Sequence, residues 1–339
     1  MPSPRALLPI LAWTFAACGP VATPSAAVTP STTVRLPPFS GDRDRDHALV
    51  GKWFEPATSR FVQLDAVLAR AVATPLVGIG ETHDDADHHA VEALILRTMI
   101  GRGRRPAVVL EMVDEDRQAA IDEGRARRIA SADDFAILVD WTHSGWPAFD
   151  LYRPIVAATL DAKLPLLAGN PSRATTRALV RHGRASLAAG EWERLLLDRV
   201  WEPSTEASLR QELVDDHCGM VSAGSPMIDG MVLAERARDA SFAHHMIAAR
   251  GDGAVLFAGS GHVRNDRGVP WALRSLKSSQ AMFTLGLIEV EKDKADPTDY
   301  AARFVTARLP FDVVLFTPSP TRTDPCAAMT PSPPPIPKP

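Results

Sequence analysis

Short apolar runs alternate with segments of helical periodicity along the middle of the chain. Helical patterns separate the first four of these runs. Continuous apolar runs that alternate with helices are typical of buried parallel strands in βαβ units. The pattern therefore predicts an α/β fold with a mostly parallel central sheet flanked by helices. The expected strands are 76–80, 107–111, 164–168, 254–258, 283–290 and 312–316.

The segment between the first two expected strands has the clearest helical period. Its apolar positions recur on one face from Val91 to Met99, and the acidic cluster Asp84–Asp87 supplies N-caps. His88 lies on the same stripe, which points it back toward the sheet near His83. It is either a cofactor ligand or a hydrogen-bonded core histidine. We expect His89 to face solvent.

Residues 113–160 and 172–250 are mainly of helical periodicity. Residues 172–250 hold no clear strand and end in a long helix from about 226 to 249. Together with 113–160 they predict a helical cap over the strand ends. The expected α/β domain is 48–316, preceded by a flexible tether at 19–47 and followed by a Pro-rich disordered tail at 317–339.

The N-terminal segment predicts export. Residues 1–18 combine Arg5 with an apolar stretch that is too short to span a bilayer. They end in Phe15-Ala-Ala-Cys18-Gly19, which resembles a bacterial lipobox. That resemblance implies a signal peptide, lipid modification of Cys18 and anchoring in the cell envelope, with Gly19 favouring the outer membrane. A plain secretory signal and an uncleaved short anchor are the alternatives.

Composition narrows the choice of partners. The chain is 45% hydrophobic and 23% charged with a formal net charge of −4, so no basic excess indicates nucleic acid. Cys218 and Cys326 could pair in an oxidising compartment, although the sequence does not require it.

Two expected strands finish in Gly-x-x-His. The first reads Gly80-Glu81-Thr-His83 and the second Gly259-Ser-Gly-His262. Ligands of α/β proteins bind beyond the carboxyl ends of parallel strands, so we expect one shared site there. Glu111, Asn170 and Ser260 follow strands in the same way. A carboxylate at such a position needs partners, whereas Asn170 is equally suited to cap a helix.

Other side chains could contribute to this site. Arg264 and Arg267 follow the second motif and could bind carboxylates or phosphates, or could simply pair with Asp266 and nearby acidic residues. His217 precedes a helix with Met residues on one face, which suits haem but equally suits core packing. The loop 141–147 carries two Trp and His143 and could line a pocket or pack on the core.

The ordered set of motifs resembles the ChaN family of haem-binding, iron-regulated bacterial lipoproteins, over about 48–316. This family is related to the Tiki/TraB and erythromycin-esterase-like group. The motifs are Gly80-Glu-Thr-His-Asp84, Leu110-Glu-Met112, Ser144-Gly-Trp-Pro147, Leu151-Tyr-Arg-Pro154, His217-Cys-Gly-Met220, Pro226-Met, Arg236-Ala-Arg-Asp239, Gly259-Ser-Gly-His-Val-Arg264 and Gly268-Val-Pro270.

The resemblance implies a membrane-anchored protein that binds haem in iron acquisition, with a homodimer holding haems between subunits as one arrangement. It also implies a Tyr iron ligand, for which the chain offers only Tyr152 and Tyr300, so a His ligand is the alternative. The cofactor-binding candidates are His83, His88, His217, His262 and Arg264.

A metal-dependent hydrolase is the second hypothesis. Glu81, His83 and His262 would hold a divalent ion or activate water, with Glu111 or His217 assisting. A structural lipoprotein whose motifs only shape turns is the third.

Overall fold

The described residues from Arg35 onward form one unit built around a central sheet. The structure is a computed structural model that describes Met1 and residues 34–127, 131–249, 251–324 and 326–327. Residues 2–18 of the predicted signal peptide, including Cys18, and residues 19–33 of the predicted tether lie outside these residues.

The sheet has eight strands in the order β2-β1-β8-β7-β3-β6-β4-β5. The six strands from β8 to β5 are parallel. The short strand β1 pairs antiparallel with β8, and the edge strand β2 pairs antiparallel with β1. The predicted α/β class with a mostly parallel sheet is therefore confirmed. The strands are β1 (Trp53–Glu55), β2 (Arg60–Val62), β3 (Leu76–Glu81), β4 (Ala107–Asp114), β5 (Leu166–Asn170), β6 (Ala254–Gly259), β7 (Met282–Glu289) and β8 (Val313–Thr317).

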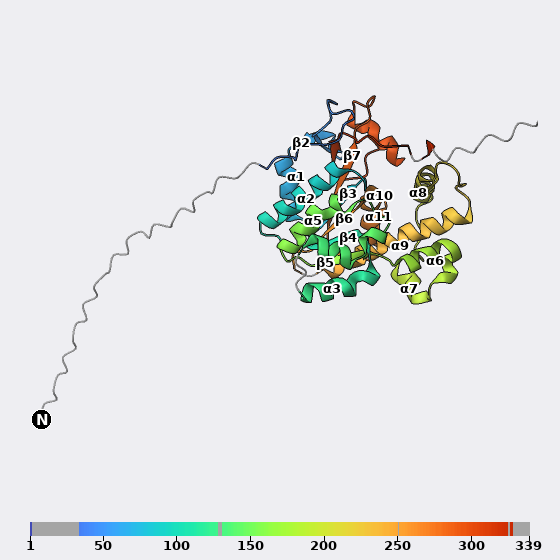
Figure 1. The fold of residues 1–339 in the computed structure, drawn as a ribbon, viewed down its shortest axis with the longest axis horizontal. Helices are drawn as coiled ribbons and strands as arrows, with labels where there is room; N and C mark the ends of the chain where they lie inside the picture. Colours follow the sequence, from blue (N-terminus) through green and yellow to red (C-terminus); the bar gives the residue numbers. More distant parts are fainter. Residues whose placement is uncertain (2–33, 128–130, 250, 325, 328–339) are drawn as a thin grey trace, which may run out of the picture. The chain divides into compact units, whose positions relative to one another are not determined.

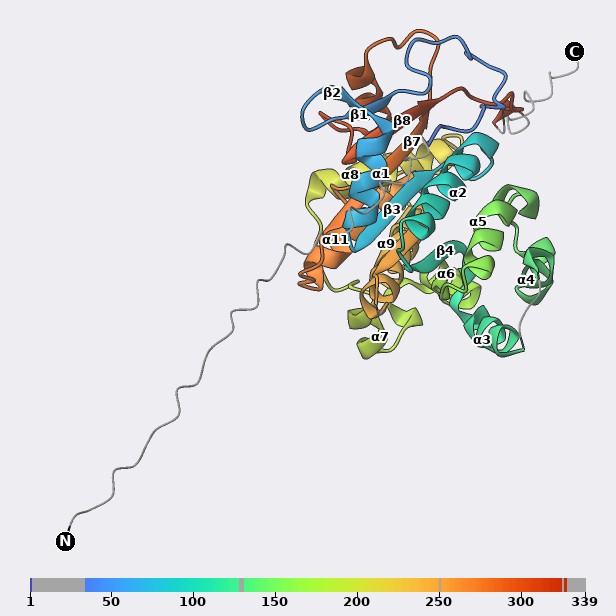
Figure 2. The same ribbon diagram turned by 90° about the vertical axis from the view of Figure 1, so that its left-hand side faces the viewer.

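Helices cover both faces of the sheet. On one face α1 packs on α2 and α2 on α5, whereas α9 and α11 pack together on the other, with α6 outside α9 (Figure 1). Figure 2 shows the same layers from the side. The helices are α1 (Leu64–Ala73), α2 (Ala86–Gly101), α3 (Gln118–Ala126), α4 (Ala132–Leu138), α5 (Phe149–Asp161), α6 (Arg173–His182), α7 (Ala189–Arg194), α8 (Pro203–Asp216), α9 (Pro226–Ala248), α10 (Ser260–Val263) and α11 (Gly268–Ser275).

Burial explains why the sheet strands read as apolar runs. All six residues of β3 are buried, as are the first five of β6, because helices cover both faces of these strands. Aliphatic side chains such as Leu76 and Leu256 are fully buried in the core. Among the described residues, no helix is both long enough and apolar enough to cross a membrane.

The packed unit extends beyond the predicted boundaries at 48 and 316. The N–H groups of Ser40 and Gly41 donate to Asp87 at 2.6 and 2.9 Å, and Arg43 forms a β-bridge with Ser319. Residues 40–43 of the predicted tether and Ser319 of the predicted tail therefore belong to the packed unit. Their small or polar side chains add little to a hydrophobic core, so the apolar pattern did not reveal them, but hydrogen bonds hold their backbone groups in place.

Three residues of the C-terminal segment, which the structure describes at 318–324 and 326–327, contact the rest of the unit. Arg322 pairs with Asp84 and Glu289, each at 2.7 Å. Thr321 binds Asp42 through its N–H at 2.7 Å. A disulfide then joins Cys326 to Cys218, just after α8. The sequence left this pairing open, and the structure forms it.

Candidate functional site

The two Gly-x-x-His motifs lie side by side because β3 and β6 are neighbours in the sheet. Their parallel register pairs Gly80 with Ala258 and Glu81 with Gly259. His83 follows β3 by two residues, and His262 lies in the single-turn helix α10 directly after β6. The β3–β6 pairing therefore brings both imidazoles to the same edge of the sheet.

Close approach requires glycine at position 80 and favours it at position 259. A Cβ on Gly80 would lie 2.8 Å from the Cα of Ser260, so only glycine lets β3 pass under α10. A Cβ on Gly259 would lie 3.0 Å from Nε2 of His83. The glycine at the end of β6 thus makes room for the His83 ring.

His83 is oriented by a carboxylate. Its Nδ1 lies 2.6 Å from Oε1 of Glu81, and its Nε2 lies 3.9 Å from Oε2 of Glu111. Burial opposes the charged imidazolium, but the negative charges of Glu81 and Glu111 outweigh it and raise the pKa of His83 to about 9. His83 is therefore an imidazolium at neutral pH whose Nδ1–H is held by Glu81.

His262 is surrounded by three carboxylates. Its Nδ1 lies 2.7 Å from Asp239, and its Nε2 lies 3.2 Å from Glu111 and 3.3 Å from Glu235. Burial again disfavours the charge, yet Glu111 and Asp239 raise the pKa of His262 well above its ordinary value. With both nitrogens engaged and little exposed surface, His262 is a poor ligand for an added group.

Glu111 joins the two histidines. Its carboxylate accepts the N–H of Gly259 at 2.7 Å and contacts His262 through the other oxygen. Burial alone would raise its pKa, but the charges of His262 and His83 hold the pKa of Glu111 well below the ordinary range. Glu111 is thus an ionised carboxylate that links the ends of β3, β4 and β6.

These groups form one end of a cavity of about 590 Å³. Trp146 stands against the His83 ring with centroids 4.7 Å apart. The remaining lining combines apolar and charged side chains. Trp201, Leu209, Leu213, Phe304 and Val305 are apolar; Glu212, Asp215, Asp216, Glu235 and Asp239 are acidic; Arg238, Arg267 and Arg303 are basic; Thr82, Ser260 and Gly261 complete it.

Arg264 does not line this cavity. It is fully buried, and its guanidinium donates to Asp266, Glu212 and the carbonyl of Phe304. Of the two alternatives for Arg264, its pairing with Asp266 is the one that the structure shows. Arg267 lines the cavity instead and is paired with Glu212.

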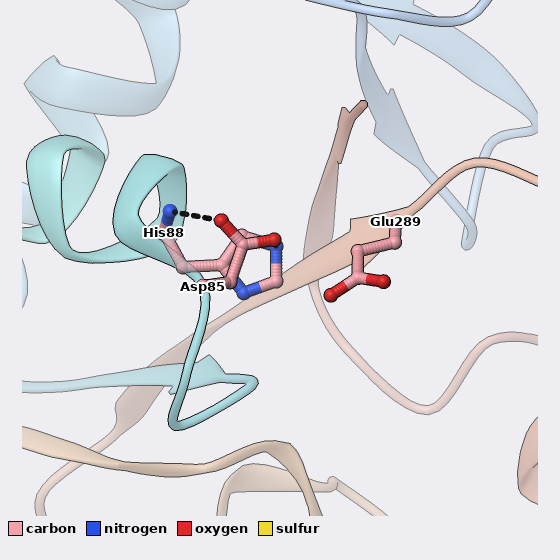
Figure 3. A group of neighbouring side chains, drawn as sticks. All are labelled: Asp85, His88 and Glu289. Carbon is pink, nitrogen blue, oxygen red and sulfur yellow. Dashed lines mark hydrogen bonds and ion pairs between the residues drawn. The ribbon is translucent and has the colours of Figure 1, made fainter. Parts of the chain in front are cut away.

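His88 also lies outside the cavity, in a buried cluster with Asp85 and Glu289 (Figure 3). Its Nδ1 accepts the N–H of Thr82 at 2.9 Å, so the proton of the neutral ring is on Nε2, 3.0 Å from Oγ1 of Thr317. Burial lowers the pKa of His88 well below its ordinary value. His88 is a hydrogen-bonded core histidine, and its predicted ligand role does not fit.

The donor atoms of Asp85, His88 and Glu289 lie within 4.8 Å of one another, as in a metal site. However, the Nε2–H of His88 offers no lone pair to a cation. Burial and the neighbouring Glu289 raise the pKa of Asp85 to about 7. The raised pKa favours the protonated, uncharged form of Asp85 beside Glu289.

Several other predicted residues are placed away from the cavity. His217 is half-buried and lines a neighbouring groove, and its Nδ1–H donates to the carbonyl of Leu213 at 2.7 Å. Asn170 binds Asp114 at 3.1 Å. His89 is buried rather than solvent-facing, because α2 is covered by α5 and its ring lies against Tyr152.

The Trp-rich loop serves both predicted purposes. Trp146 lines the cavity, whereas Trp141 is buried and donates to the carbonyl of Pro147. His143 is 79% exposed at its side chain and pairs with Asp140.

Neither tyrosine reaches the cavity. The hydroxyl of Tyr152 lies 3.1 Å from the carbonyl of His83, and that of Tyr300 accepts the N–H of Glu291. Both side chains are fully buried. The chain has only these two tyrosines, so the Tyr iron ligand implied by the family resemblance is not available.

Sequence reasoning named the Arg236–Asp239 motif of α9 only as part of the family resemblance, and missed that charged residues of this helix surround His262. Glu235 and Asp239 lie one turn apart and both face His262. Arg238 lines the same cavity. The signal was four charged residues within the five positions 235–239 of a helix that is otherwise rich in buried residues.

The fold and site define an α/β protein with a histidine–carboxylate cavity at the carboxyl ends of parallel strands. A family model described as haem-binding uptake, Tiki superfamily, ChaN, matches residues 67–273, more than half of the chain. The chain therefore belongs to this family.

Two solved structures match most of the chain, and the first of them shows the same fold. One is described as cofacial heme binding to ChaN of Campylobacter jejuni; it has a TM-score of 0.62 and 17% identity, covering 78% of this chain and 95% of that chain. The other is a mutant of the erythromycin esterase EreC in its open conformation, with a TM-score of 0.45 and 12% identity, covering 80% and 99%. No curated protein matches the chain.

Proposed function

We propose that this protein binds haem in the cavity at the ends of β3, β4 and β6. Membership of the haem-binding ChaN family is the observation that carries the proposal. The residues present fit the group. Trp146, Trp201 and Phe304 offer aromatic faces to a macrocycle, and arginines stand among the lining residues.

His83 is the candidate iron ligand. Its side chain is 33% exposed, compared with 10% for His262, and its Nδ1 is already held by Glu81. A carboxylate on the second nitrogen is the usual support for a ligating histidine, because it fixes the ring and increases its basicity. Nε2 of His83 would release its proton when the iron binds.

Haem iron would supply the redox and ligand chemistry of the bound group. The chain's own residues would position it: Glu81 orients His83, Glu111 fixes the neighbouring N–H of Gly259, and Trp146 covers the imidazole. We further propose a role in iron acquisition, with a homodimer as the assembled form.

An absorbance titration of the purified protein with ferric haem tests the proposal. We expect saturable binding with a shifted Soret band. His143→Ala serves as control, because His143 is an exposed imidazole outside the cavity with the same kind of carboxylate partner. A wild-type protein that produces no spectral shift would contradict the proposal.

Lipid anchoring through Cys18 is a separate part of the proposal. It is supported by the lipobox-like sequence before Cys18. We propose a lipid-modified protein of the bacterial outer membrane. Metabolic labelling with a palmitate analogue should mark the wild type and leave Cys18→Ala unlabelled.

A hydrolase is the second candidate, favoured by the buried His–carboxylate network. Oε2 of Glu81 is buried without a hydrogen-bond partner, so it could accept a proton from a bound water. The metal-dependent form is not favoured, since among the described residues the donor atoms of Glu81, His83 and His262 do not form a converging group. Ester and peptide hydrolysis that Glu81→Gln abolishes would support it.

A further inference from the structure

A second cavity of about 510 Å³ lies between α6 and α9, next to the haem cavity. Leu213, Glu235 and Arg238 line both cavities, so the two adjoin each other. The lining of this second cavity, the α6–α9 groove, is strongly basic. It contains Arg173, Arg177, Arg181, Arg238 and His217 but only one carboxylate, Glu235.

Three of these arginines form a single stripe on α6. Arg173, Arg177 and Arg181 are spaced by four residues, so they stand one above another on the same helix face. Like charges at this spacing destabilise a helix. The C-terminal dipole of α6 compensates this only at Arg181, in the last turn.

Among the three arginines of the stripe, Arg173 alone has partners in the described part of the chain. It lies 3.9 Å from Asp114, a distant pair, and it also donates to the carbonyl of His143 at 3.3 Å. Within the described part of the chain, Arg177 and Arg181 form neither a hydrogen bond nor an ion pair, although both line the groove. An anion in the groove would relieve their mutual repulsion.

The wall between the two cavities also offers a donor. Nε of Arg238 is buried without a hydrogen-bond partner, whereas Nη1 is held by Glu235. Glu235 in turn contacts His262, so the groove's one carboxylate is already engaged. The groove therefore presents unpaired positive charge beside the cavity that holds the histidines.

We propose that the α6–α9 groove is an anion subsite that receives the carboxylates of the ligand held in the haem cavity. The identity of that ligand as haem rests on the proposed function, whereas the basic lining of the groove is observed independently of it. Haem carries two propionates that are ionised at neutral pH, and guanidinium groups bind carboxylates through paired N–H donors.

The test compares haem with its dimethyl ester, which keeps the iron and the macrocycle but lacks the charges. In Arg177→Glu/Arg181→Glu, haem affinity should fall about tenfold or more, because two attractive charges become repulsive. Affinity for the dimethyl ester should match that of the wild type. Arg60→Glu/Arg125→Glu reverses two exposed arginines away from both cavities and should change haem affinity by no more than about twofold.

The possible results distinguish a failure of the proposed anion subsite from a failure of the proposed haem binding. Unchanged haem affinity in Arg177→Glu/Arg181→Glu would overturn the subsite and leave haem binding intact. If the wild type binds no haem, the proposed function fails. A citrate titration, followed by amide shifts in NMR spectra, then tests whether the groove binds anions. Citrate binding that the double variant loses would support an anion subsite, and absence of citrate binding to the wild type would overturn it.

Discussion

Oε1 of Glu81 lies 2.6 Å from Nδ1 of His83, although only one residue separates them in the chain. Glu81 ends β3 and is fully enclosed by the sheet and its helices, whereas His83 projects into the cavity. The pair therefore connects the buried sheet to the surface on which a ligand would bind. Its charge state should govern what binds there.

Glu81→Gln should lower the pKa of His83 from about 9. Burial opposes the imidazolium, and the substitution removes the largest charge that offsets it. Because the raised pKa stabilises the fold below pH 6.5 and this contribution is lost as the pH rises toward 9, the variant should show a flatter stability profile across that range. NMR titration of the His83 ring gives the pKa, and chemical unfolding at several pH values gives the profile.

Asp140→Asn is the matched control for that change. Asp140 holds His143 at 2.7 Å on the surface, so its loss should leave the titration of His83 untouched. If His83 titrates identically in the wild type and in Glu81→Gln, the assigned electrostatic role of Glu81 is wrong.

Gly259→Ala should disturb His83 without adding any charge. The new Cβ would lie 3.0 Å from Nε2 of His83, so the ring or the end of β6 must shift. We expect a loss of about 1–3 kcal/mol in the free energy of unfolding, together with weaker haem binding. Gly190→Ala, in α7 where a Cβ meets nothing within 4 Å, should be neutral or slightly stabilising. If the two variants had the same stability and the same haem affinity, Gly259 would not be needed to make room for the His83 ring.

Much of this arrangement could be predicted because it depends on local sequence. Strand ends follow from apolar runs, and a parallel sheet brings the ends of its strands to one edge. The adjacency of β3 and β6 then joins His83 to His262. Glu111 was predictable for the same reason, as the polar residue within β4 that follows its apolar run.

The rest depended on packing between distant segments. Asp239 and Glu235 meet His262 only because α9 crosses the ends of the strands. Arg264 and Arg267 are three residues apart, and the turn between them decides which one faces the cavity. His89 is buried because α5 covers α2, which the sequence of α2 alone does not reveal.

Asp85→Asn should stabilise the protein at alkaline pH. With a raised pKa of about 7, Asp85 favours its protonated form in the folded state, so its contribution to stability falls as the pH rises from about 4 to 7. Asparagine keeps the N-cap of α2 but cannot ionise. The variant should therefore match the wild type at or below about pH 4 and exceed it increasingly up to pH 8 in chemical unfolding. Stabilisation of the wild type by a divalent cation at pH 8, absent in the variant, would instead indicate a metal at this cluster.

The Cys218–Cys326 disulfide should contribute to global stability. It closes a segment with a sequence separation of 108 residues and ties the end of α8 to the C-terminal segment. Cys218→Ser/Cys326→Ser should reduce the free energy of unfolding by about 2–4 kcal/mol. A reducing agent should lower the stability of the wild type and leave the double variant unchanged. Insensitivity of the wild type to reduction would contradict this.

The most direct test of the central claim is the ligation of ferric haem by His83, followed by electron paramagnetic resonance. The wild-type complex should carry the signature of an imidazole ligand. His83→Ala should lose that signature and recover it when free imidazole is added, whereas His143→Ala should match the wild type. An unchanged spectrum in His83→Ala would show that His83 does not hold the iron.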